Sequence, residues 1–292
     1  HCRAFHRVVA PGALLYTEMV HAQAVIQGDR ERLLGFDASE HPVALQLGGS
    51  DPEALAQATR IGAEWGYDEV NLNVGCPSDR VQAGRFGACL MKEPALVAEC
   101  IAAMSAAARV PVTVKCRLGV DEQEDYEVFL AFVDTVAATG CTRFVVHARK
   151  AWLSGLSPKE NREIPPLRYE WVHRLKRARP GLHVSLNGGL DQVEQCLEQL
   201  QHVDAVMLGR CAYHEPYRLH LLDCALSGRA PRTRARLLRD YLPYVEAQLA
   251  RGVALKHITR HILGLFHAQP GGRAFRQVLS EQAPKAGAGL EV

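Results

Sequence analysis

The 292-residue chain lacks several patterns that would each define a class of protein. It has nine cysteines but no C-x-x-C pair, which argues against a disulfide framework or a metal site and favours the reducing cytoplasm. No apolar run is long enough to span a bilayer and no signal peptide is visible, so we expect no membrane partner. Neither a G-x-x-x-x-G-K-[ST] loop nor a G-x-G-x-x-G fingerprint occurs, so neither a P-loop nor a Rossmann nucleotide site is indicated.

What the chain does contain is a repeated alternation of short apolar runs and helical patterns, which predicts buried parallel strands. The runs cover residues 13–20, 42–48, 69–74, 111–117, 143–148, 183–187 and 205–209. This alternation admits a barrel or a doubly wound sheet. Nearly every run ends on a polar residue or glycine, as expected where all strand ends converge on the mouth of a barrel.

We therefore predict an α/β fold, a (β/α)₈ TIM barrel, over residues 1–228. Seven strands leave this barrel one short. Because the chain opens at His1 without a Met, we expect the missing first strand to precede it.

After residue 228 the strand pattern stops, and residues 229–292 predict a small all-helical bundle. Amphipathic helices are expected over 233–250, 254–266 and 271–282. This region holds eleven Lys and Arg against four Asp and Glu, a net +7, whereas residues 1–228 hold 23 against 28, a net −5. A basic tail on a mildly acidic body predicts that the tail binds a polyanion.

The most informative stretch is NLNVGCPSDRVQAGRFGACLM, residues 71–91. An apolar run ends there at Gly75-Cys76-Pro77, where proline removes a backbone donor and stops the strand. Cys76 is thus expected on a stiff turn near the amide of Asn73, a place for an acid or a nucleophile. The alternative is a small buried thiol. The flanking Gly and Pro, with Arg80 and Arg85 nearby, favour chemistry.

The last two strands end in Asn187-Gly188-Gly189 and Gly209-Arg210, which predict a phosphate site. Glycine permits close approach of the backbone, and arginine adds a fork of donors. Ordinary turn glycines are the alternative for either pair alone, but two pairs on consecutive strands favour phosphate.

Lys115, within a strand and expected to point into the barrel, needs an anionic partner or a covalent role. Three interpretations of Lys115 are open: it faces a flavin, it forms a Schiff base, or it pairs with a structural carboxylate. Gln46 and His147 lie on strands that flank the expected mouth, and both are expected to donate hydrogen bonds to a ligand. In the polar loop over residues 154–166, Lys159 and Arg162 suit phosphate contacts or base edges, although a solvated loop is the usual alternative.

With these residues in place, the chain resembles the tRNA-dihydrouridine synthases. The segment NVGCPSDRVQAGRFGACLM is similar to their signature, and VKCRLG, VHAR, NGG and the GRCAYHEPY segment follow in the expected order. SGLSPKENREIPPL is similar to the subfamily acting at positions 20 and 20a of the tRNA D-loop. The Pro- and Met-rich strand with which the family opens has no counterpart here.

The resemblance implies an FMN barrel followed by a tRNA-binding helical domain. Cys76 would be the proton donor. The residues that would contact FMN are Gln46, Lys115, His147, Asn187, Gly188, Gly189, Gly209 and Arg210. Those that would contact tRNA are Asn73, Lys159, Glu160, Arg162, Arg273 and Arg276.

The implied reaction is reduction of uridine to 5,6-dihydrouridine, with hydride from reduced FMN to C6, a proton from Cys76 to C5, and NADPH as reductant. We expect a monomer. Three alternatives stay open: a dihydroorotate- or dihydropyrimidine-type flavin barrel acting on a free base, a Schiff-base aldolase using Lys115, and a non-catalytic RNA-binding barrel.

Overall fold

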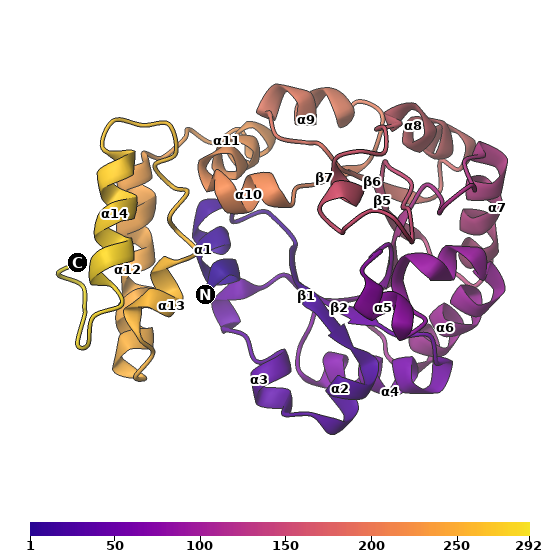
Figure 1. The fold of residues 1–292 in the computed structure, drawn as a ribbon, viewed down its shortest axis with the longest axis horizontal. Coiled ribbons are helices and arrows are strands. Elements are labelled where there is room, and N and C mark those ends of the chain that lie inside the picture. Colours follow the sequence, from indigo (N-terminus) through magenta and orange to yellow (C-terminus); the bar gives the residue numbers. More distant parts are fainter.

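A computed structural model of the protein describes residues 1–292, apart from the side chain of Arg80, which lies outside the described residues. Its centre is one sheet of seven parallel strands that follow one another in chain order (Figure 1). The strands are β1 Leu15–His21, β2 Val43–Gly48, β3 Glu69–Val74, β4 Val112–Arg117, β5 Arg143–His147, β6 His183–Asn187 and β7 Ala205–Met207. All seven predicted strands are confirmed, with ends within two residues of those expected.

Helices surround this curved sheet on its outer side, which gives a TIM-barrel-like fold (Figure 1). The long ones are α4 Pro52–Glu64, α6 Pro94–Ala107, α7 Tyr126–Ala137, α8 Tyr169–Ala178, α9 Val193–Gln199 and α11 Pro216–Ser227. Shorter ones are α2 Ala22–Gln27, α3 Arg30–Leu34, α5 Asp79–Ala83, α10 Arg210–His214 and the 3₁₀ turns Ala38–Glu40, Gly87–Lys92 and Glu160–Arg162. Strands β2 and β3 are buried along their whole length, so the main core lies between sheet and helices.

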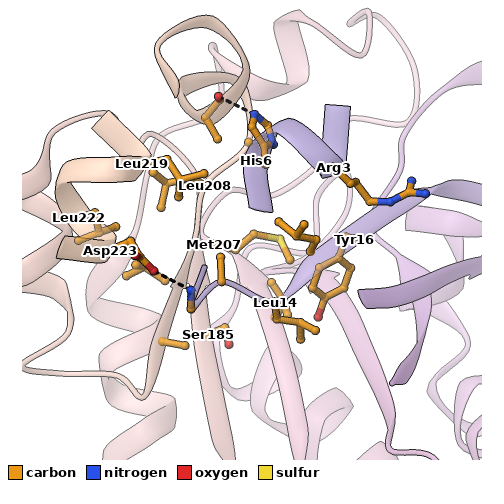
Figure 2. Close-up of a pocket in the computed structure, with 18 of the residues that line it drawn as sticks. Arg3, His6, Leu14, Tyr16, Ser185, Met207, Leu208, Leu219, Leu222 and Asp223 are labelled. Atoms are coloured by element: carbon orange, nitrogen blue, oxygen red, sulfur yellow. Dashed lines mark hydrogen bonds between the residues drawn. The ribbon is translucent and has the colours of Figure 1, made fainter. Parts of the chain in front are cut away.

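The barrel is open along one side, because β1 and β7 end the sheet and do not pair with each other. An eighth strand is absent from residues 1–292 as the structure describes them. Between the two edges lies a cavity of about 830 Å³, here called the side cavity. Figure 2 shows Leu14 and Tyr16 on one flank and Met207 and Leu208 on the other.

A second hydrophobic core joins both ends of the chain. It is built from α1 Cys2–Val9, α12 Arg234–Ala250, α13 Leu255–Thr259 and α14 Gly272–Gln282, which stand beside the barrel in Figure 1. Phe5 of α1 packs edge-on against Tyr241 of α12, with ring centroids 5.1 Å apart. Helix α1 was not predicted, and the division of the chain at residue 228 stays a proposal. No helix in the described residues is long and apolar enough to cross a membrane.

The predicted helix over 254–266 is wrong in its second half, because α13 ends at Thr259. The following residues form tighter turns, in which Ile262 and Leu265 donate to carbonyls three residues earlier. Gly264 explains the change: a Cβ there would lie 2.1 Å from the carbonyl oxygen of His214. The chain therefore leaves the helical path to pack directly on the end of α10.

Candidate active site at the barrel mouth

The carboxyl ends of the strands surround a second cavity of about 800 Å³, here called the mouth cavity. Ends of parallel strands meet at one face, so residues far apart in sequence come together there. Ten of the predicted site residues line it: Asn73, Cys76, Lys115, His147, Arg162, Asn187, Gly188, Gly189, Gly209 and Arg210. The other five, Gln46, Lys159, Glu160, Arg273 and Arg276, do not.

Cys76 sits on a turn held by hydrogen bonds to its backbone. The N–H groups of Gly75 and Cys76 both donate to the Asn73 side-chain oxygen, at 3.0 and 2.9 Å. The Cys76 carbonyl accepts from the N–H of Ala88 at 2.9 Å. Its sulfur lies 3.6 Å from the hydroxyl of Ser78, and Cys76, a half-buried residue, lines the mouth cavity. The thiol is therefore presented by a turn whose shape does not depend on the sulfur.

Lys115 also lines the mouth cavity, where burial and then the nearby Arg117 lower its pKa from 10.5 to about 8. In the part of the chain that the structure describes, its amine has no carboxylate partner and no side-chain hydrogen bond. The interpretation as a lysine paired with a structural carboxylate therefore fails. A half-buried cation without a protein partner is a place for a ligand anion.

His147 is neutral, because burial and the positive charges of Arg117 and Lys115 lower its pKa from 6.5 to about 2. A neutral imidazole offers one donor and one acceptor to a ligand. Its ring lies against the turn after β6, where a Cβ at Gly188 would come within 2.5 Å of His147. Since Gly188 also has a φ of +110°, glycine is required there by both backbone conformation and packing.

The Gly209-Arg210 turn leaves room for a ligand. A Cβ at Gly209 would meet no protein atom within 4 Å, so the space over this turn is open. Arg210 forms an ion pair with Glu163 at 2.5 Å, and both side chains are nearly half exposed. Exposed pairs of this kind contribute at most about 1 kcal/mol, so the arginine can exchange Glu163 for a phosphate at small cost.

Arg117 is a residue of the site to which sequence reasoning gave no role. Only 4% exposed, it donates to the backbone carbonyls of Gly75 at 2.8 Å, Lys150 at 3.0 Å and Asn161 at 2.9 Å. It thereby ties the Cys76 turn to the loop that carries Arg162. The sequence feature that could have revealed this role is its position two residues after Lys115, which places both side chains on the same face of β4.

Replacing Arg117 with Met is expected to lower the free energy of unfolding by about 3 kcal/mol, because it leaves buried carbonyls without donors. Thermal denaturation measures the loss. Arg177→Met, at an exposed arginine of α8, is the matched control and should unfold as the parent does. Equal melting temperatures for the two variants would show that the Arg117 hydrogen bonds do not support the fold.

The remaining predicted residues lie away from the mouth cavity. Lys159 and Glu160 lie in the loop above it, where the Glu160 carboxylate accepts from the N–H of Ser157 at 2.8 Å. Arg273 and Arg276 are exposed on one face of α14. Gln46 is buried within the barrel, beneath Asn73.

The side chains that precede and follow the Cys76 turn add little to the site. Arg85 is exposed and does not line the mouth cavity, whereas the side chain of Arg80 is outside the described part of the structure. Among the residues with described side chains, no group of three His, Cys, Asp or Glu is placed to hold a metal ion.

Fold and site together define an enzyme with a TIM-barrel-like fold, whose mouth presents a thiol beside unpaired positive charge. The chain belongs to the dihydrouridine synthase family: the family described as "Dihydrouridine synthase (Dus)" matches residues 1–291. The resemblance found in the sequence is thus confirmed.

Similar proteins agree with this membership. A Xanthomonas campestris pv. campestris protein named tRNA-dihydrouridine(20/20a) synthase is 70% identical over 292 residues, covering 100% of this chain and 87% of that protein. A Shewanella oneidensis protein of the same name is 57% identical over 294 residues, covering 100% and 88%. An old yellow enzyme homologue from Zymomonas mobilis has a TM-score of 0.55 at 12% identity, covering 80% of this chain and 84% of that one, and shares the fold.

Proposed function

We propose that this enzyme reduces uridine to 5,6-dihydrouridine in the D-loop of tRNA, at positions 20 and 20a, with FMN as cofactor and NADPH as reductant. Family membership and the names of the relatives support the reaction and the positions. The observation that carries the proposal is that the Cys76 thiol and the unpaired Lys115 amine line the same cavity. A monomer in the cytoplasm is part of the proposal.

The residues of the mouth fit FMN. A cavity of about 800 Å³ is within the usual range for cofactor sites. Arg210 and the open Gly209 turn would hold the phosphate. Lys115 would lie against the ring system, and its positive charge would stabilise negative charge there. His147, which lines the cavity, would add hydrogen bonds, whereas Gln46 lies beneath Asn73 and would act by holding the Asn73 amide in place.

FMN held in this cavity would supply hydride chemistry toward C6 of the uracil ring, with NADPH as the source of electrons. The role of Cys76 is to deliver its Sγ proton to C5 as a general acid. Its only side-chain partner among the described residues is the Ser78 hydroxyl, so no base competes for that proton. Arg117, whose side chain reaches the neighbouring carbonyl, would stabilise the thiolate left behind.

Uridine must leave the stacked tRNA to reach this cavity, because a buried ring cannot be approached by a paired or stacked base. Arg162 lines the mouth cavity and Lys159 stands in the loop beside it, so they would contact the extruded nucleotide, with Asn73 and Glu160 nearby. Arg273 and Arg276 would hold phosphates farther along the tRNA.

The double substitution Arg273→Ala and Arg276→Ala is expected to raise the KM for tRNA about tenfold while NADPH oxidation without tRNA stays unchanged. Steady-state kinetics at several salt concentrations measure both. The control is Arg60→Ala with Arg177→Ala, two exposed arginines on barrel helices. A shift of similar size in the control would mean that net charge, rather than α14, determines the KM.

The deciding experiment incubates the protein, FMN and NADPH with an unmodified tRNA transcript and maps dihydrouridine by mass spectrometry. Product at positions 20 and 20a supports the proposal. Parallel reactions contain free uracil or dihydroorotate without tRNA. Turnover of a free base, with no change in tRNA, would replace the proposal by the free-base oxidoreductase.

A further inference from the structure

A continuous chain of hydrogen bonds runs through the barrel interior beneath the mouth cavity. Its lower end is Glu69, which is 4% exposed and accepts at Oε1 from the hydroxyls of Tyr16 and Thr113, both at 2.7 Å. Tyr16 stands on the flank of the side cavity in Figure 2. The Thr113 oxygen accepts in turn from the side-chain amide of Asn71 at 2.8 Å.

The upper half of this hydrogen-bond chain leads from Asn71 to the Cys76 turn. Gln46 donates through its side-chain amide to Asn71 Oδ1 at 2.8 Å, and Asn73 donates to Gln46 Oε1 at 2.8 Å. Asn73 Oδ1 then accepts the backbone N–H groups of Gly75 and Cys76. A buried carboxylate is thus linked to the Cys76 turn through four side chains.

The strand geometry explains why these residues meet. Glu69, Asn71 and Asn73 alternate along β3, so all three point to the barrel interior. In the sheet, Asn71 is in register with Gln46 of β2 and with Thr113 of β4. One strand therefore supplies alternate members of the chain, and its two neighbours supply the others.

The two ends of this chain force a single orientation on everything between them. A carboxylate only accepts hydrogen bonds, so Thr113 must donate to Glu69 and accept from Asn71. A backbone N–H only donates, so Asn73 must turn its oxygen toward Gly75 and Cys76. Under both constraints, each carboxamide of Asn71, Gln46 and Asn73 donates its N–H toward Glu69 and accepts at its oxygen from the Cys76 side. Flipping one carboxamide would place an N–H against an N–H, or an oxygen against an oxygen.

We propose that Asn71 and Thr113 are positioning residues: they transmit the orientation set by Glu69 through Gln46 to Asn73, and so fix the Cys76 turn and the Asn73 amide at the cavity wall. This inference rests on the proposed FMN site. The chain uses one N–H and one lone pair of the Gln46 carboxamide. Asn73 in turn gives one N–H to Gln46, and its second N–H is then held in a fixed position at the wall of the mouth cavity, where the cofactor is proposed to bind.

The test compares Thr113→Val, which breaks the chain, with Tyr16→Phe, which removes a hydrogen bond to the same Glu69 oxygen outside the path. We expect the valine variant to bind FMN about tenfold more weakly to the apoprotein, as fluorescence quenching measures. The Tyr16→Phe variant should bind as the parent does, and Thr113→Ser, which restores a hydroxyl, should recover the affinity.

A second readout needs no cofactor. In ligand-free protein, side-chain amide signals of Asn71, Gln46 and Asn73 in ¹⁵N–¹H spectra should exchange slowly in the parent and in Thr113→Ser, and quickly in Thr113→Val. If the parent binds no FMN, the proposed function fails, but these amide signals still test whether the hydrogen-bond chain orders Gln46 and Asn73.

If Thr113→Val does not fold, Asn71→Asp takes its place, because it keeps the side-chain shape and removes the donor. The proposal would be overturned if the Thr113 or Asn71 variant lost thermal stability but kept the amide exchange and FMN affinity of the parent. The hydrogen-bond chain would then have only a structural role. Equal losses in Tyr16→Phe would also overturn the proposal.

Discussion

Cys76→Ala is expected to lower dihydrouridine formation at least 100-fold while the protein still binds FMN and still oxidises NADPH. Delivery of a proton by a positioned acid contributes about 10²- to 10⁴-fold to rates of this kind. Alanine cannot deliver one. Rapid-reaction spectroscopy separates the two halves of the cycle, because reduction by NADPH and reoxidation by tRNA are observed separately.

The structure makes this loss specific to the sulfur. The Cys76 turn is held through backbone groups, by Asn73, Ala88 and the Arg117 guanidinium, and none of these contacts involves the thiol. Alanine therefore keeps the turn in place. Parent-like product formation in the variant would remove Cys76 from the mechanism.

A second cysteine of the same segment provides the control. Cys89 is half-buried, and its thiol lies 3.1 Å from the carbonyl oxygen of Phe86, outside the mouth cavity. Cys89→Ala should retain full activity in the same assay. A comparable loss there would point to disturbance of the segment rather than to a missing proton donor.

The strands and the mouth were predictable because they depend on local patterns. Short apolar runs bounded by Gly, Pro and polar residues define parallel strands. Parallel strands in chain order bring their ends to one face, so Cys76, Lys115 and His147 could be placed together before any coordinates. The same argument about strand ends predicted that the Gly209 turn lies at this face.

Other features depend on contacts between distant segments. The role of Arg117 is set by carbonyls of residues 75, 150 and 161, which no local pattern reveals. Helix α1 has an amphipathic sequence, with Ala4, Phe5 and Val9 buried, and this signal was missed. The periodicity of the sequence does not reveal that α1 packs on α12, which begins more than 200 residues later.

Lys115→Met is expected to have opposite effects on stability and on cofactor binding. The Lys115 pKa is about 8 in the folded protein and 10.5 for an ordinary lysine, so folding disfavours the charged form. The unfolded chain thus binds more protons between these values, and the cost of the buried charge is fully present below pH 8. It disappears as the pH rises to 10.5.

Removing that charge should raise the free energy of unfolding of the ligand-free protein by up to about 3 kcal/mol at pH 7, with no gain near pH 10.5. Chemical denaturation at a series of pH values measures the difference. The control is Lys256→Met, at an exposed lysine of α13, which should change stability little at any pH.

The same Lys115→Met protein should bind FMN at least tenfold more weakly, because the cation proposed to face the ligand is gone. A gain in stability with a loss of binding is the signature of a charge kept for a ligand rather than for the fold. If the variant were instead less stable at pH 7, Lys115 would have a partner within the protein. Its place in the cofactor site would then have to be abandoned.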